Sequence, residues 1–135
     1  MGLSDEDPHL MAAASFAAVA VGGAVGTALR YAVTGWAHRV MPCTFPYGTL
    51  TVNVVGSLVV GFAAGVFAGR AEPRDNLLQL FLIVGACGGF TTFSAFSADT
   101  YHLVQRGDLA SAALNVTVQV VGSLVAVFAG FWLSR

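Results

Sequence analysis

Four stretches without Asp, Glu, Lys or Arg most constrain what this 135-residue chain can form. They run from Leu10 to Leu29, from Val40 to Gly69, from Asn76 to Ala98 and from Leu109 to Ser134. A helix needs about 20 predominantly apolar residues to cross the hydrocarbon core of a bilayer. A soluble domain carries about 25% charged residues, whereas 10% of this chain is charged. We therefore expect an all-α membrane protein with a single domain, residues 1–135, of four transmembrane helices.

The bounds of these helices follow from the residues that separate the apolar stretches. Two prolines lie in the first connection, a polar segment around Pro73 forms the second, and Gly107 with Asp108 forms the third. Acidic residues precede the first helix where a secretory signal would be basic, so we expect that helix to remain in the mature protein. The expected helices span about 12–34, 47–68, 77–104 and 110–133.

The third stretch contains the sequence Gly-Ala-Cys-Gly-Gly-Phe-Thr-Thr-Phe-Ser-Ala-Phe-Ser, residues 85–97. Gly88 and Gly89 weaken a continuous helix there, and the two threonines that follow can cap a restarted helix. Broken helices at membrane depth usually line an ion or substrate site, because their freed N–H and C=O groups cannot face lipid. We expect the third helix to be broken in the middle of the membrane.

Polar and aromatic side chains recur at spacings that place them on common helix faces. Phe93 and Phe96 stand three residues apart, so they share a face beyond the expected break. The second helix carries Thr49, Asn53 and Ser57 at four-residue spacing, and the fourth carries Asn115, Gln119 and Ser123. Such stripes either join helices or line a path, and the residues alone favour packing for Asn53.

Two features of the first helix stand out, a glycine face and a late arginine. Gly22 and Gly26 form a Gly-x-x-x-Gly pair, which Gly23 widens into a smooth face that another helix can approach closely. Arg30 follows late in the helix, and we expect its side chain to snorkel toward the lipid headgroups rather than to bind a ligand directly. Alternatively, it adds positive potential at a vestibule that attracts anions.

The uncharged stretches exclude several chemistries. They hold no carboxylate to carry protons, no paired carboxylates and no phosphate-binding loop, so we expect neither an enzyme nor a nucleic-acid partner. The histidines and cysteines have no metal spacing: His9, His38, His102, Cys43 and Cys87. A path lined by hydroxyls, amides and aromatic edges offers donors without negative charge, and its natural passenger is a small anion.

The basic residues are almost balanced across the expected membrane. If the helices alternate in direction, the arginines divide into Arg70, Arg74 and Arg135 on one side and Arg39, Arg106 and the nearby Arg30 on the other. The Lys/Arg imbalance that normally orients a membrane protein is therefore small, which is compatible with insertion in both directions. Four short helices seldom enclose a pathway, so we predict an antiparallel, dual-topology homodimer. Alternatively, loop length or the acidic N-terminus fixes one orientation.

Three segments of the chain resemble the Fluc family of fluoride channels, also called CrcB. They are Gly-Gly-Ala-Val-Gly-Thr-Ala-Leu-Arg-Tyr at 22–31, Gly-Thr-Leu-Thr-Val-Asn-Val-Val-Gly-Ser at 48–57 and Gly-Gly-Phe-Thr-Thr-Phe-Ser-Ala-Phe-Ser at 88–97. The resemblance covers essentially all four helices. It implies a passive fluoride channel of the inner (plasma) membrane that relieves fluoride toxicity. The implied assembly is an antiparallel homodimer in membrane lipid, with two pores and a central structural sodium ion.

The resemblance also implies roles for individual residues. Phe93 and Phe96 match the two phenylalanines whose ring edges face fluoride, and such an edge is the positive end of the ring quadrupole. Asn53 matches the pore asparagine, which moves its interpretation from packing to function. Thr49 and Ser94 are further candidate donors.

The implied sodium site uses the backbone carbonyls of Gly88 and Thr91 at the break. The same pair from an inverted subunit would complete a set of four oxygens on the dimer axis, and carbonyl oxygens suit a hard monovalent cation. We expect this ion to be structural rather than transported.

The chain departs from the family pattern at three positions. Asn115 stands where a tyrosine is common, Gln119 where a serine is common, and Ala95 where a threonine is common. Ser123 continues the face of the two amides, which can still donate hydrogen bonds. The expected consequence is a polar path with altered conduction.

Two other classes of protein remain open on the sequence alone. A small dual-topology drug exporter has a similar length and charge balance, but proton coupling would need a carboxylate within the membrane. A helper subunit without transport activity would explain the glycine-rich faces, but it leaves the Phe/Ser/Thr segment unexplained.

Overall fold

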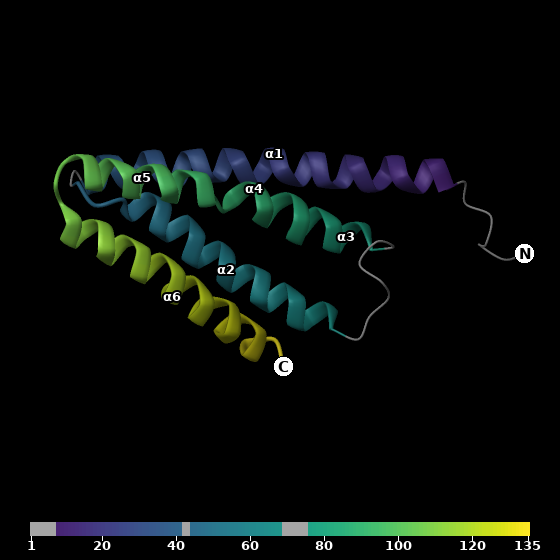
Figure 1. The fold of residues 1–135 in the computed structure, drawn as a ribbon. Coiled ribbons are helices and arrows are strands. Elements are labelled where there is room, and N and C mark those ends of the chain that lie inside the picture. The colour runs from purple at the N-terminus through teal and green to yellow at the C-terminus, as the bar shows by residue number, and fades with distance from the viewer. Residues whose placement is uncertain (1–7, 42–43, 69–75) are drawn as a thin grey trace, which may run out of the picture.

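The structure is a computed structural model that describes residues 8–41, 44–68 and 76–135, and its elements are helical in those ranges (Figure 1). The third passage consists of four consecutive pieces, one of them the π-helix η2. The elements are α1 Pro8–Val40, α2 Tyr47–Phe67, α3 Leu77–Gln79, η2 Leu80–Cys87, α4 Gly88–Phe90, α5 Phe93–Gln105 and α6 Leu109–Leu133. Four spans are long and apolar enough to cross a membrane, as expected.

The observed helices differ from the expected ones in two main respects. The first helix was expected over 12–34 but runs from Pro8 to Val40, because proline is tolerated at a first helical position and the next proline is Pro42. The π-helix is a second difference, since its wider turns leave no clear periodicity in a uniformly apolar segment. Cys43, Arg70, Arg74 and the acidic residues 5–7 lie outside the described ranges.

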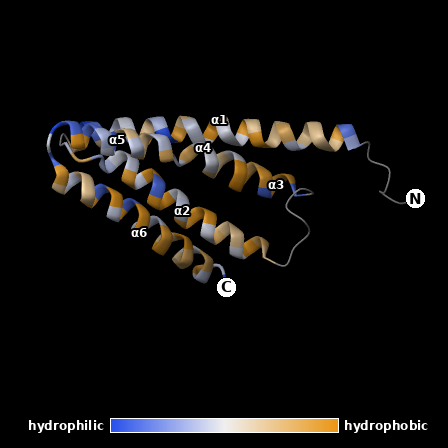
Figure 2. Ribbon diagram, in the orientation of Figure 1, coloured by the Kyte–Doolittle hydropathy of each residue, from blue (hydrophilic) through white to orange (hydrophobic). Residues whose placement is uncertain are grey.

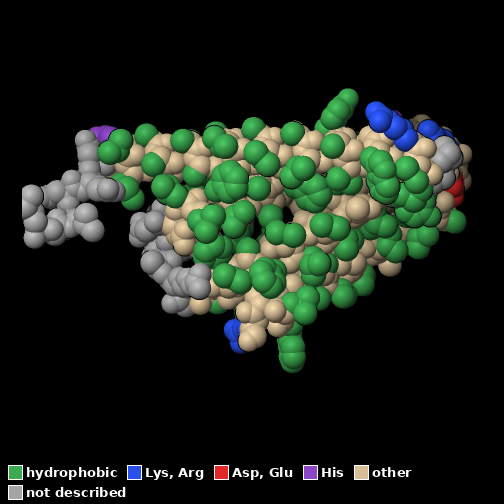
Figure 3. Space-filling view, turned by 180° about the vertical axis from the view of Figure 1, so that it is seen from behind, with side chains coloured by type: hydrophobic (Ala, Val, Ile, Leu, Met, Phe, Trp, Pro, Cys, Tyr) green, Lys and Arg blue, Asp and Glu red, His purple; other side chains and the backbone are tan. Residues whose placement is uncertain are grey.

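The four spans pack as two pairs, α2 with α6 and α1 with the third passage. α2 packs mainly against α6, and α1 packs mainly against η2 and α4. Hydrophobic residues predominate in η2, α2 and α6, while hydrophilic ones gather toward the end where α5 turns into α6 (Figure 2). Large apolar side chains such as Phe16 and Trp132 are exposed in the single chain. Hydrophobic side chains cover much of the face seen in Figure 3, as expected where a membrane protein meets lipid.

The break in the third passage lies at the two threonines and not at the two glycines. Gly88 and Gly89 are helical, within α4, so the expectation that they interrupt the helix is wrong. Thr91 and Thr92 have extended backbone, and the Thr92 Oγ1 accepts a hydrogen bond of 3.1 Å from the amide of Ala95. The predicted threonine cap is thereby confirmed. We call Thr91 and Thr92 the break.

The glycines of the third passage instead permit close packing against α1. A Cβ atom on Gly89 would lie 2.5 Å from the carbonyl oxygen of Gly23, a distance that real Cβ atoms essentially never show. Likewise, a Cβ atom on Gly22 would collide with the carbonyl of Phe81, and one on Gly26 with that of Ala86. The predicted smooth face of α1 is therefore confirmed at Gly22 and Gly26.

Replacing Gly26 with alanine should destabilise the protein by about 2 kcal/mol, because a buried overpacked atom forces backbone to move. The melting temperature in detergent should fall by roughly 5 °C. Gly23→Ala is the matched control, since a Cβ at Gly23 would meet nothing within 4 Å. Equal melting temperatures for the two variants would show that α1 and the third passage do not pack at this distance.

The last turn positions α5 and α6 as neighbours. Gly107 has a φ of 76°, which favours glycine, and Asp108 caps α6 by accepting a hydrogen bond of 3.0 Å from the amide of Ser111. Hydrogen bonds from Ser111 also lower the pKa of the Asp108 carboxyl. This confirms the predicted short turn between the third and fourth spans.

Candidate functional site

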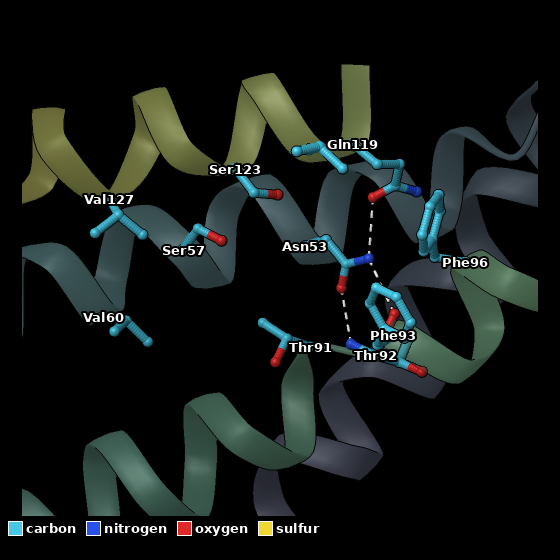
Figure 4. A pocket seen from close by; sticks show the side chains of 11 residues that line it. Asn53, Ser57, Val60, Thr91, Thr92, Phe93, Phe96, Gln119, Ser123 and Val127 are labelled. Atoms are coloured by element: carbon cyan, nitrogen blue, oxygen red, sulfur yellow. Dashed lines mark hydrogen bonds between the residues drawn. The ribbon is translucent and has the colours of Figure 1, made fainter. Parts of the chain in front are cut away.

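Asn53 of α2 connects the break to α6 (Figure 4). The amide of Thr92 donates to Asn53 Oδ1 at 2.7 Å, and Asn53 Nδ2 donates to the carbonyl of Thr92 and to Gln119 Oε1, both at 3.0 Å. Because the Thr92 amide needs an acceptor, the oxygen of Asn53 must face it. Both amide protons of Asn53 are consequently committed to protein acceptors.

This arrangement fixes the orientation of Gln119 in turn. Its Oε1 faces Asn53, so its Nε2 points elsewhere, and that buried nitrogen has no hydrogen-bond partner. The side chain of Gln119 is only 4% exposed. An unpaired buried donor costs about 1–3 kcal/mol, and such a group calls for a ligand or water to complete it.

Asn115, one turn earlier on α6, is fully buried. Its Nδ2 donates to Thr100 Oγ1 at 2.9 Å, and that hydroxyl donates to the carbonyl of Phe96. The Oδ1 of Asn115 has no partner. The side chain thus ties α6 to α5 and leaves a second unpaired atom in the interior.

A pocket of about 300 Å³ lies between α2, the break and α6, and we call it the central pocket. Its lining combines amides and hydroxyls with apolar side chains. In Figure 4, Ser57 and Ser123 lie to one side of Asn53, with Val60 and Val127 beyond them. The lining residues are Asn53, Ser57, Val60, Thr91, Thr92, Phe93, Phe96, Gln119, Val120, Ser123 and Val127.

Phe93 and Phe96 form an edge-to-face pair at the mouth of this pocket. Their ring centroids are 5.2 Å apart, with an interplanar angle of 64°. Phe96 is 9% exposed, whereas Phe93 is 78% exposed in the single chain. The positive ring edges are the parts of an aromatic side chain that can approach an anion.

The break frees two backbone carbonyls from their helical partners. In a continuous helix the Thr92 amide would donate to Gly88 and the Ala95 amide to Thr91, but those amides donate to Asn53 and to the Thr92 hydroxyl. Arg30 Nη1 donates to the Thr91 carbonyl at 3.2 Å. Our expectation that Arg30 only snorkels is therefore wrong, since an unpaired carbonyl at this depth attracts its guanidinium.

A second cavity, of about 620 Å³, adjoins the central pocket, and we call it the polar groove. Thr49 and Ser94 line this groove rather than the central pocket. Thr49 Oγ1 donates to Asp99 Oδ2 at 2.6 Å, and the hydroxyls of Ser94 and Thr92 are 3.2 Å apart. Thr92 lines both cavities and so connects them.

The structure therefore brings together most of the residues singled out in the sequence. Of the residues expected to line the fluoride path, five line the central pocket, two line the polar groove with Ala95, and Asn115 lines neither of these cavities. Ser57 and Thr91, also singled out in the sequence, line the central pocket as well. Sequence reasoning missed the roles of Thr92 and Asp99. Thr92 stands in the motif, but only the fold shows that its amide meets Asn53. The five path residues in the central pocket are Asn53, Phe93, Phe96, Gln119 and Ser123.

Asp99 contradicts the expectation that the membrane spans contain no carboxylate. It lies inside the third span, Leu77–Gln105, although the uncharged stretch ends just before it. The span is longer than the uncharged stretch because α5 continues to Gln105. The hydroxyl of Thr49 is the partner that makes a carboxylate tolerable there.

Four apolar spans around a polar pocket and a broken helix define a multi-pass membrane protein of the channel and transporter class. The family described as "CrcB-like protein, Camphor Resistance (CrcB)" matches residues 17–131, and the chain belongs to this family.

Similar proteins carry the name "Fluoride-specific ion channel FluC". The protein of Nitrobacter winogradskyi is 47% identical over 118 residues, 87% of this chain and 93% of its own length. That of Rhizobium etli is 48% identical over 120 residues, with the same two shares. That of Agrobacterium fabrum is 44% identical over 121 residues, 90% of this chain and 96% of its own length. These relatives are ion channels by name and not enzymes, in agreement with the expectation from the sequence.

Proposed function

We propose that this protein is a passive, fluoride-selective channel that exports fluoride down its gradient and so relieves fluoride toxicity. The observation that carries the proposal is the central pocket, in which hydrogen-bond donors and two phenylalanine rings gather without a negative charge among its lining residues. The names of the relatives support fluoride as the ion. The inner (plasma) membrane is the proposed location.

The unpaired Nε2 of Gln119 is the donor best placed to replace part of the hydration shell of fluoride. Asn53 contributes mainly by holding the break and by orienting Gln119, because its own protons are committed. The hydroxyls of Ser57 and Ser123 and the edges of the two rings continue the path. Each contact is weaker than a full charge, which allows a bound ion to leave. A narrow passage excludes the larger chloride ion.

We propose that the functional unit is an antiparallel homodimer with two pores. The 78% exposure of Phe93 supports this assembly, since an aromatic ring at the mouth of a polar pocket gains most from a second chain that covers it. The near balance of arginines in the sequence supports an inverted partner.

A structural sodium ion between the two breaks is a further part of the proposal. Gly88 and Thr91 would supply carbonyl oxygens, and both have lost a helical donor to other acceptors. Thr91 retains a second lone pair beside the one that accepts from Arg30. When bound, the ion would offset the repulsion between the partial negative charges of the facing carbonyl oxygens of two subunits.

The test is ion efflux from liposomes that contain the purified protein, followed with fluoride and chloride electrodes. We expect rapid fluoride loss, chloride loss at the rate of protein-free liposomes, and reduced fluoride loss when N-methylglucamine replaces sodium throughout purification and assay. Fluoride movement that requires a proton gradient would favour the exporter class through Asp99. No fluoride movement by a folded dimer would contradict the channel and favour a helper subunit.

A further inference from the structure

A third cavity, of about 180 Å³, extends the polar groove to the end of the bundle where α5 turns into α6. We call it the end pocket, and it shares His38 and Asp99 with the polar groove. Because the groove also shares Thr92 with the central pocket, the three cavities are neighbours, with the groove between the other two. The end pocket is lined by His38, Thr44, Phe45, Pro46, Asp99, His102, Leu103 and Arg106.

The charge around the end pocket favours an anion. Arg106 lines the end pocket and Arg30 lines the groove behind it, against the single carboxylate of Asp99. That carboxylate accepts the hydroxyl of Thr49, which draws part of its charge away from the cavity. In the described part of the chain no group of three His, Cys, Asp or Glu side chains could hold a metal ion. Figure 3 shows basic side chains at this end, with an acidic side chain beside them.

Two imidazoles make this charge adjustable. His38 comes from the end of α1 and His102 from α5, and both line the end pocket. Imidazole is the side chain that gains a positive charge as the pH falls through the physiological range. Protonation of both would add two positive charges beside the two guanidiniums. The other charged or titratable groups that face them are Arg30 and Tyr31 of α1, and Asp99, Tyr101 and Arg106 of α5.

We propose that the end pocket is a proton-tuned binding site for small inorganic anions, fluoride among them, at the mouth of the conduction path. Protonation of His38 and His102 raises the local concentration of anions and thereby the rate at which they reach the central pocket. This inference rests on the proposed function, since it assigns regulation to the same path. Acid also increases the entry of neutral hydrogen fluoride, so the site would open the exit when it is most needed.

The test is the fluoride current through the dimer in planar bilayers at low fluoride, with the same pH on both sides, at about pH 7.5 and about pH 5.5. Neutral hydrogen fluoride carries no current, so its leak does not enter the measurement. We expect the current of the unmodified protein to rise about threefold at the lower pH, and less at high salt, which screens the site. Saturating fluoride should remove the difference.

Three variants separate the site from the rest of the molecule. His38→Gln with His102→Gln should give a current that does not rise with acid, and His38→Arg with His102→Arg should give a high current at both pH values. His9→Gln, at the other end of α1, should behave as the unmodified protein. Dimer formation on gel filtration shows that each variant is folded.

The possible contrary outcomes have different meanings. An acid-induced rise that persists in the double glutamine variant, or an unmodified channel whose current ignores pH, would overturn the proton-tuned site while leaving the channel intact. A complete lack of fluoride current in the unmodified protein would instead overturn the proposed function. The arginine variant must also lose its pH dependence, since retention would place the sensor elsewhere.

Discussion

Replacing Asn53 with aspartate should abolish fluoride conduction while the protein remains folded. The variant keeps an oxygen for the Thr92 amide, and Gln119 can turn its amide to donate to the new carboxylate. The buried, unpaired donor of the central pocket, Gln119 Nε2, would then be consumed. A negative charge about 4 Å from the ion would add a repulsion of about 4 kcal/mol at an effective dielectric constant of 20. The expected loss of current is on the order of several hundredfold.

The measurement is the fluoride current at about pH 8, where a carboxylate is normally ionised, together with the melting temperature. Ser57→Ala is the matched control, because Ser57 lines the same pocket one turn further along α2. That variant should retain most of the current. A large fluoride current through a folded Asn53→Asp dimer would show that ions do not pass the central pocket.

The sequence predicted the four spans well, because uncharged stretches of this length have few other solutions. The expected break at Gly88 and Gly89 is three residues from the observed one, which lies at threonines instead of glycines. Glycine weakens a helix in isolation, whereas Gly89 is required here for contact with α1. The extended backbone belongs to Thr92, whose amide finds a better acceptor in Asn53 than in the preceding turn.

The site was predictable only as a set of residue types on common faces. Four-residue spacing correctly placed Asn53 and Gln119 on faces that can meet, but it does not reveal which atom donates to which. That assignment follows from the Thr92 amide, which lies 39 residues away from Asn53 in the chain. The contact of Arg30 with the Thr91 carbonyl likewise depends on how α1 crosses the break. Long-range pairing of this kind leaves no local pattern.

Replacing Phe93 with isoleucine should remove most of the fluoride current, on the order of a hundredfold. Isoleucine preserves apolar bulk but has no ring edge, so the positive end of the quadrupole is lost where the ion leaves the amide and hydroxyl donors. The edge-to-face contact with Phe96 disappears as well, which allows that ring to turn. If only the volume of this side chain mattered, the Phe93→Ile channel would still conduct fluoride.

The matched control for this substitution is Phe128→Ile on α6. Phe128 is 68% exposed and is absent from the lining of the central pocket. Its replacement makes the same chemical change on the outer surface, where a lipid tail accepts either side chain. Fluoride efflux and dimer yield should be unchanged. Equal efflux from the two variants would mean that ring edges do not bind the ion, and that the unpaired amide of Gln119 with the hydroxyls of α2 and α6 suffices for conduction.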